Sequence, residues 1–474
     1  MLSSPTAGAS AHVMKPAVRG LSDDAVPLVM FAVAIVAGIF LTPAQNDTWW
    51  HLHSGRVMWE TRAFLTTEQF SFASGGQPLQ NHWWLTQVLF FGIFSLGGPL
   101  LLASFAGACA AAAIYMSFRL TRGTSELRLL MLVALVLCTA PEWSVRPQVV
   151  SLALMMAMAT CIARGGLVWL PLLCLIWGNA HAMVVFGIVL AGAAGLEAIV
   201  WSRAQLRKVT VITLLCVAAP MCSPIGLSYW PRVLATVSTS QALDLQEYRT
   251  PLSLVDLPFW LLLIALVGVV IRFRARIPQL ARGERTLLIA SLVLALAALS
   301  AARNVAFFAV LAVPVITALV AHDTRRRTFR PAGWPAYLLL AVEAAAAVWF
   351  VSARWQQHGA SLGWQPLPAG TVQAVRECEG PMFNTLEDGG PLMWALNGRK
   401  VFVDSRMEAY PQALLAQSRA ADLEGRYETL FAEFRITCAV VPTGSPLDMR
   451  LRTDTALRVT HRDDRRTVFA RAIS

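Results

Sequence analysis

The feature that most constrains this chain is a succession of apolar segments that recurs over most of its length. About eleven of them are predicted to be transmembrane helices, although several are shorter than the roughly 20 residues of a typical span. Their expected bounds are 25–43, 99–118, 127–140, 149–162, 167–177, 183–201, 209–221, 257–271, 286–301, 306–320 and 337–351. Only 14% of the residues are charged, whereas soluble domains carry about 25%. The sequence therefore predicts an α-helical polytopic membrane protein.

Two segments near the N-terminus need separate treatment. Residues 1–24 are polar and no small-residue cleavage site follows the first apolar run, so we expect an N-terminal tail and an uncleaved first helix. A long loop, 44–82, comes next and is rich in Trp, His and polar residues. The segment 83–96 is apolar but only about 14 residues long, which favours a helix at the membrane interface over a full span.

The distribution of basic residues predicts the orientation. The chain has 39 Lys and Arg against 28 Asp and Glu, but most of the basic residues lie in short loops, and the pattern of a nucleic-acid surface is missing. When the spans alternate sides, one side collects most of them, and that side is expected to be cytoplasmic. Its basic residues are Arg119, Arg122, Arg128, Arg164, Arg203, Arg207, Lys208, Arg272, Arg274, Arg276, Arg282, Arg285, Arg325, Arg326, Arg327 and Arg330.

An odd number of spans after a cytoplasmic tail 1–24 predicts that residues 352–474 are extracytoplasmic. This segment alternates short β-like runs at 381–384, 400–404, 437–441, 457–461 and 467–471 with helix-like stretches at 391–397 and 412–434. Such a rhythm is typical of a small α/β domain. Cys378 and Cys438 are its only cysteines, and we expect them to lie close enough for a disulfide in an oxidising compartment.

Polar residues that are costly near a membrane gather at the outer ends of the spans, where ionisable groups are functional candidates. Directly after the first span comes a stretch with Asp47, His51 and His53. A carboxylate followed by two imidazoles is suited to binding a divalent cation or to acid/base catalysis. An interfacial Trp belt with solvated polar neighbours would produce the same pattern.

The next outer loops supply further candidates. Glu142 is a second candidate metal ligand or base, and Arg146 is suited to holding a phosphate, unless the two simply pair with each other. Arg303 interrupts two apolar runs, where an arginine needs an anionic partner or extends to the interface. A lipid phosphate would be a natural partner for it.

Three more candidates have weaker signals. His181 ends a span on the same side, although a lone histidine there is more often structural. Asp404 and Arg406 follow a predicted buried strand, where α/β sheets often place ligand contacts.

The stretch Asp-x-Trp-Trp-His-Leu at 47–52 resembles the first-loop motif of GT-C glycosyltransferases. It is most similar to that of the catalytic subunit of oligosaccharyltransferase. A wider resemblance to bacterial multispanning proteins of GT-C type rests on 47–55, 68–72, 82–87, 146–148, 179–181, 303–308, 389–390 and 401–406. These landmarks are short but are spread over most of the chain.

The resemblance implies a GT-C-like fold and a transferase in the bacterial inner membrane. Such an enzyme moves a sugar from a polyprenyl-phosphate-linked donor to an acceptor on the extracytoplasmic face. Asp47 matches the first-loop acidic residue that is catalytic or binds the metal, and Glu142 is the only acidic residue of the next outer loop. These two are the predicted catalytic residues and the tentative ligands of a divalent cation, Mg or Mn. The predicted substrate-binding residues are His51, His53, Arg146, His181, Arg303, Asp404 and Arg406.

Two other classes of function remain open at this point. A transporter or lipid flippase would bury polar residues near the midplane and have related halves, and neither feature is clear. A non-catalytic scaffold of the cell envelope would leave the outer polar residues scattered around the rim of the bundle. The transferase hypothesis instead predicts that five residues converge on one outward-facing cavity. They are Asp47, His51, Glu142, Arg146 and Arg303.

Overall fold

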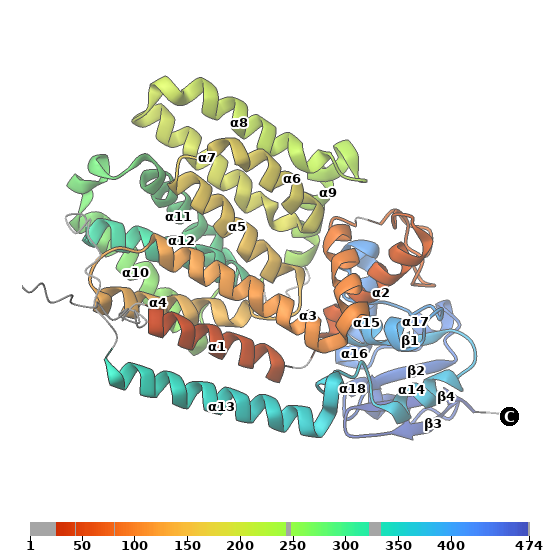
Figure 1. Ribbon diagram of the computed structural model, residues 1–474. Helices are drawn as coiled ribbons and strands as arrows, with labels where there is room; N and C mark the ends of the chain where they lie inside the picture. Colours follow the sequence, from red (N-terminus) through yellow and green to blue (C-terminus); the bar gives the residue numbers. More distant parts are fainter. Residues whose placement is uncertain (1–24, 43, 80, 243–247, 322–332, 473–474) are drawn as a thin grey trace, which may run out of the picture.

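The computed structural model describes residues 25–42, 44–79, 81–242, 248–321 and 333–472. A bundle of long helices forms the larger part of the molecule, and a smaller domain containing a β-sheet lies at one end of it (Figure 1). The predicted N-terminal tail, 1–24, and the arginines at 325–327 and 330 lie outside the described residues.

Each of the predicted spans corresponds to a helix of the bundle. In the described part of the chain, seven helical segments are long and apolar enough to cross a bilayer, and Ala25–Phe40, Pro147–Ala163 and Leu167–Ala180 are shorter apolar helices. The protein is therefore a multi-pass membrane protein. The helices are α1 (Ala25–Leu41), α3 (Trp84–Leu120), α4 (Ser125–Thr139), α5 (Pro147–Ala163), α6 (Leu170–Ala180), α7 (Val185–Val200), α8 (Leu206–Ala218), α10 (Leu257–Arg272), α11 (Arg282–Ser300), α12 (Val305–Val320) and α13 (Trp334–His358).

Two helices that precede the C-terminal domain were not predicted. α2 (Asn46–Thr61) occupies the first part of the expected loop 44–82, and α9 (Tyr229–Ala242) lies between α8 and α10. Neither has the long apolar run by which we recognised the spans. α2 packs closely on α3, and a side chain on Gly55 would overlap the carbonyl of Gln87. Tertiary packing therefore stabilises α2, a helix that could not be predicted from local hydrophobicity.

α3 contains a sharp bend. Gly97 and Gly98 have non-helical backbone angles, and Gly98 has a φ of 60°, which is unfavourable for residues with a side chain. The bend separates 84–96 from the following helix, as the sequence predicted. An interfacial position for the first half stays a prediction.

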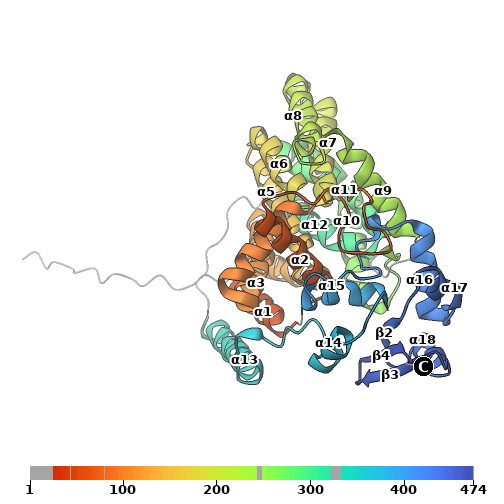
Figure 2. The same ribbon diagram turned by 90° about the vertical axis from the view of Figure 1, so that its right-hand side faces the viewer.

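α12 forms the centre of the bundle, and α13 lies at its edge beside α1 (Figures 1 and 2). Nearly every residue of α12 is buried, from Val305 to Leu319, which agrees with a helix that is apolar on all sides. α13 buries none of its residues within the protein, so its apolar surface is left for lipid.

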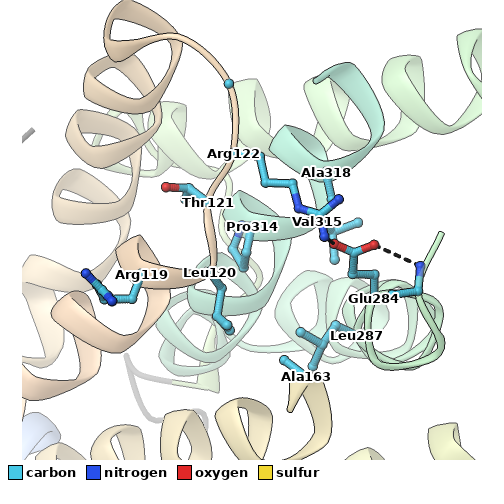
Figure 3. A pocket seen from close by; sticks show the side chains of 12 residues that line it. Arg119, Leu120, Thr121, Arg122, Ala163, Glu284, Leu287, Pro314, Val315 and Ala318 are labelled. Atoms are coloured by element: carbon cyan, nitrogen blue, oxygen red, sulfur yellow. Dashed lines mark hydrogen bonds and ion pairs between the residues drawn. The ribbon is translucent and has the colours of Figure 1, made fainter. Parts of the chain in front are cut away.

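Arginine-rich loops meet at the end of the bundle far from the sheet domain (Figure 1). They border a cavity of about 270 Å³ in which Arg122 pairs with Glu284, and Glu284 also accepts a hydrogen bond from Ala281 N at 2.9 Å (Figure 3). Arg276 donates to the last carbonyls of α12 at 3.1 Å. The structure thus brings together basic loops that the sequence assigned to one side. That this side is cytoplasmic stays a prediction.

The C-terminal domain is built on a four-stranded sheet with the order β1-β2-β4-β3. β1 (Met382–Asn384) is parallel to β2 (Cys438–Pro442), whereas β3 (Leu457–Arg462) and β4 (Arg466–Arg471) pair in antiparallel fashion. All four strands match predicted ones. The expected helix 412–434 is divided at Gly425, which has a φ of 69°. The helices of the domain are α14 (Ala369–Arg376), α15 (Leu386–Ala395), α16 (Gln412–Glu424), α17 (Glu428–Glu433) and α18 (Pro446–Leu451).

The predicted strand 400–404 is wrong, because this segment does not join the sheet. Val401 N instead donates to Phe70 O at 2.8 Å, and Phe72 N donates to Val401 O at 3.1 Å. The side chain of Asn384 bonds to two neighbouring backbone groups: its Oδ1 accepts from Phe402 N, and its Nδ2 donates to Val403 O. The segment is buried and extended as expected, but its backbone groups bond to the loop 66–79 and to the side chain of Asn384 instead of to a strand of the sheet.

The domain is joined to the bundle by aromatic packing. Trp394 of α15 lies 6.0 Å from the ring of Trp49 and 5.4 Å from that of Phe94, and Arg56 stacks over it at 4.6 Å. These contacts fix the start of α2 against the C-terminal domain.

Cys378 and Cys438 form a disulfide, with Cα atoms 6.2 Å apart. The bridge joins the end of α14 to β2, and the expectation that these two residues lie within bridging distance is confirmed.

Candidate functional site

A cavity of about 390 Å³ lies between the helix bundle and the C-terminal domain. Its walls come from the start of α2, the ends of α6 and α11, helix α9 and residues 405–408 of the C-terminal domain. Four residues singled out in the sequence line it: Asp47, His51, His181 and Arg303. Further polar or aromatic lining residues are Trp50, His82, Trp83, Gln148, Phe186, Tyr248, Ser300, Asn304, Ser405 and Glu408.

Asp47 is held in place from both domains. Its Oδ1 accepts hydrogen bonds from Ser405 Oγ at 2.6 Å and from Trp50 Nε1 at 3.2 Å, and its Oδ2 lies 3.5 Å from Arg146 Nη1. Burial raises the pKa of Asp47, but Arg146 and the Ser405 hydroxyl, with His51 and Trp50, outweigh it and bring the pKa below its ordinary value. The side chain is 27% exposed, so an ionised carboxylate faces the cavity at neutral pH.

Arg146 connects the two predicted catalytic carboxylates. It precedes α5, and its Nη2 lies 4.0 Å from Glu142 Oε2 in the short helix η1 (Ala140–Glu142). Thr48 Oγ1 donates to Val145 O at 3.0 Å and so holds this loop on α2. Glu142 and Arg146 thus lie directly behind Asp47, and Arg146 balances the charge of both carboxylates.

Arg303 reaches the cavity from η10 (Ala302–Asn304), just before α12. Its Nη1 donates to the Tyr248 hydroxyl at 2.7 Å, and its guanidinium lies 4.8 Å from the centre of the Tyr248 ring. The neighbouring loop is fixed by Ala302 N, which donates to Arg249 O at 2.9 Å. Arg303 is therefore a positioned cation in a cavity that also holds an anion.

Two of the three histidines that line the cavity, His51 and His181, are held by neighbouring side chains. The His51 ring lies 3.6 Å from that of Trp50, and burial lowers the pKa of His51 to about 3 in spite of the Asp47 carboxylate. His51 is thus neutral at pH 7 and can bind substrate by hydrogen bonding, but not as a cation. His181 Nδ1 lies 2.7 Å from Ser151 Oγ, which accepts from Trp177 Nε1 at 2.8 Å.

Four of the predicted binding residues do not line the cavity. They are Arg146, which pairs with Asp47, together with His53, Asp404 and Arg406. His53 packs against Phe70 and is hydrogen-bonded to Arg56 at 2.9 Å, because two residues along a helix place it on the opposite face from His51. Asp404 and Arg406 are buried beside the cavity rather than in its wall.

Asp404 and Arg406 belong to a buried ionic network. Arg406 Nη2 lies 2.6 Å from Asp404 Oδ2, and its Nη1 lies 2.9 Å from Glu68 Oε2. The Tyr410 hydroxyl donates to Asp404 at 2.5 Å, and Glu68 Oε1 accepts from Phe70 N at 2.6 Å. The network fastens the C-terminal domain to the loop after α2 and thereby positions residues 405–408 at the cavity.

Sequence reasoning missed several residues of the site. Ser405 lies between the two residues that were selected, but a serine in a loop carries no signal by itself. Glu408 also had no motif, since it follows a predicted strand at a distance. Tyr248 lies in the long loop 223–256, where the sequence favoured a solvated face over a cover for the site. Glu68 was noticed only as a landmark of the resemblance. The structure explains why a carboxylate lies at this position, because Glu68 is the buried partner of Arg406.

The residues predicted to bind a divalent cation are already paired. Both oxygens of Asp47 have partners, and Arg146 lies between Asp47 and Glu142. Within the described ranges, no group of three or more His, Cys, Asp or Glu residues is arranged to hold a metal ion. The donor set in this arrangement does not fit a metal.

Comparisons with known proteins place the fold. No protein-family model and no curated protein matches the sequence. Among solved structures, the archaeal oligosaccharyltransferase AglB from Archaeoglobus fulgidus, in complex with an inhibitory peptide and a dolichol-phosphate, has a TM-score of 0.57 at 11% identity. The match covers 88% of this chain and 69% of AglB.

ArnT from Cupriavidus metallidurans, bound to undecaprenyl phosphate, has a TM-score of 0.54 at 13% identity, over 95% of this chain and 98% of ArnT. Both proteins are membrane glycosyltransferases of the GT-C superfamily. The likeness extends over the helix bundle and the C-terminal domain together. The chain therefore has the GT-C fold, as the first-loop motif predicted.

Proposed function

We propose that this protein is a membrane glycosyltransferase that moves a sugar from a polyprenyl-phosphate-linked donor to an acceptor. The single observation that carries the proposal is the cavity between the bundle and the C-terminal domain, which joins an ionised carboxylate, Asp47, to a positioned cation, Arg303. Sequence-distant segments supply these groups. A non-catalytic scaffold would give no reason for polar groups from distant segments to meet in one cavity.

The chemistry of glycosyl transfer needs the groups that the cavity offers. The acceptor attacks the anomeric carbon while the bond to the lipid phosphate breaks, so that positive charge develops on the sugar and negative charge on the phosphate. Asp47 would orient the acceptor, accept its proton and stabilise the developing positive charge, and Arg303 with the Tyr248 hydroxyl would hold the phosphate. The polyprenyl phosphates bound to AglB and ArnT support a lipid of this class.

Arg303 supplies the first test. Replacing Arg303 with alanine is expected to weaken the binding of undecaprenyl phosphate to the purified protein about 10- to 100-fold, because a charge-assisted hydrogen bond contributes roughly 1.5–3 kcal/mol. Binding of the radiolabelled lipid in detergent measures the affinity. Arg458→Ala removes an exposed arginine of the sheet domain and serves as the matched control.

Two outcomes would count against the proposal. Equal affinity of the wild type and Arg303→Ala would remove the phosphate from this cavity. Binding without any transfer of sugar from a panel of lipid-linked donors would favour a scaffold or a transporter.

Chelation tests the divalent cation that the resemblance implies. Because Arg146 already balances Asp47 and Glu142, we expect transfer by the purified protein to continue within about twofold after dialysis against EDTA. Activity before and after dialysis is compared, with Mg²⁺ or Mn²⁺ added back. Complete loss that either cation restores would mean that Arg146 gives way to a metal during the reaction.

A further inference from the structure

Glu408 faces the cavity from the C-terminal domain and has no part in the roles proposed for Asp47, Arg303 and Tyr248. It lies in η12 (Met407–Ala409), directly after the buried network of Arg406. Its Oε1 is buried and has no hydrogen-bond partner among the residues that the structure describes. A charged oxygen in such a position is unfavourable, because burial removes the solvation that would stabilise its charge.

The surroundings of Glu408 favour the neutral carboxyl group. Burial, together with the negative charges of Asp404 and Glu68, raises the pKa of Glu408 to about 8, although a hydrogen bond from its own backbone amide and the charge of Arg406 act in the opposite direction. Arg406 is already engaged by Asp404 and Glu68 at 2.6 and 2.9 Å. At pH 7 the Glu408 side chain therefore carries a proton that it can donate.

We propose that the Glu408 carboxyl group donates a hydrogen bond to the phosphate of the polyprenyl-phosphate lipid in this cavity. The inference rests on the proposed function, since it needs the phosphate to bind there. An ionised phosphate oxygen only accepts hydrogen bonds, so a protonated carboxyl is a suitable partner and an ionised one would repel it. Glu408 and Arg303 line the same cavity from the two domains, and together they would hold the phosphate between them.

Other titratable groups line the cavity, and their titration must be distinguished from that of Glu408. They are Asp47, His51, His82, His181, Tyr248 and Arg303. The pKa values of Asp47 and His51 are lowered and lie well below the range of interest. Helix α9 packs against η12, and Arg232, the charged side chain described on it, donates to Leu79 O at 3.2 Å.

The sign of the expected pH dependence follows from the raised pKa. Below about pH 8 Glu408 is protonated and donates to the phosphate. As the pH rises above this value the proton is lost, and binding weakens because the hydrogen bond is replaced by repulsion. The bound phosphate holds the proton more tightly, so the loss extends over a further pH unit or so, about tenfold in affinity.

The experiment measures the affinity of the full-length protein in detergent for radiolabelled undecaprenyl phosphate between pH 6.5 and 9.5. Wild type is expected to lose about tenfold more affinity over this range than Glu408→Gln, whose amide donates but does not titrate. Because glutamine does not titrate, the pH dependence that remains in Glu408→Gln measures the titration of the lipid phosphate itself. Glu408→Met, neutral and without a donor, is expected to bind about tenfold more weakly than wild type at pH 7.

The outcomes separate this inference from the proposed function. If wild type and Glu408→Gln have parallel pH profiles, or if Glu408→Met binds as tightly as wild type at pH 7, Glu408 does not donate to the phosphate, and the proposed function stands. If wild type does not bind the lipid at any pH, the proposed function itself is rejected. Should Glu408→Met fail to fold, the comparison of wild type with Glu408→Gln still decides.

Discussion

Replacing Arg406 with methionine is expected to lower the free energy of unfolding by about 3–5 kcal/mol, because it leaves two buried carboxylates without their cation. The side chains of Arg406, Asp404 and Glu68 are at most 1% exposed. Water cannot replace the lost guanidinium, and the Tyr410 hydroxyl can compensate only Asp404. Since Glu68 holds the loop after α2, we also expect the contact between the C-terminal domain and the bundle to loosen.

Thermal and urea unfolding of the purified protein, followed by circular dichroism, measures the effect. Arg450→Met is the matched control, because Arg450 pairs with Glu428 on the surface, where the two side chains are 62% and 58% exposed. An exposed pair contributes about 0–1 kcal/mol. Equal stability of the two variants would mean that the network does not hold the domain.

Replacing Asp47 with asparagine is expected to reduce sugar transfer at least about 100-fold, the lower end of what a positioned carboxylate contributes. Asparagine keeps the shape and can still accept from Ser405 and Trp50, so the loss would come from the charge. Release of undecaprenyl phosphate from a radiolabelled lipid-linked sugar, with and without acceptor, measures the rate.

The control for Asp47 is Glu424→Gln, which removes a carboxylate that is 54% exposed and pairs with Arg426 on the surface. Its transfer rate should equal that of the wild type. Lipid binding by Asp47→Asn should persist, because Arg303 and Tyr248 remain. Unchanged transfer by Asp47→Asn would remove this carboxylate from the mechanism, whatever lipid the cavity binds.

Many features of the fold could be predicted because they depend on local properties of the chain. Apolar length marks the spans, and short β-like runs mark β1, β2, β3 and β4. α2 escaped prediction because its polar sequence is stabilised by packing against α3 and α15. The segment 400–404 was assigned to the sheet because an extended buried run looks the same whether its partners are strands or a loop.

In the candidate site, too, some residues could be predicted from local properties of the chain and others could not. Asp47, Glu142, Arg146 and Arg303 stand out because a charge at the end of an apolar run is costly. His53 was selected along with His51 because their helix was not foreseen, and helical periodicity separates them by about half a turn. Ser405 and Glu408 became visible only when the C-terminal domain was placed on the bundle.

The sequence alone was enough to establish a polytopic helical protein with a small α/β domain, since the cost of placing charges and unpaired backbone groups in lipid leaves few alternatives. The tertiary structure decided which charges meet. Arg146 lies between Asp47 and Glu142, Arg406 lies between Asp404 and Glu68, and the cavity joins both domains. Pairings of this kind depend on distances between segments far apart in the chain, and local composition does not encode those distances.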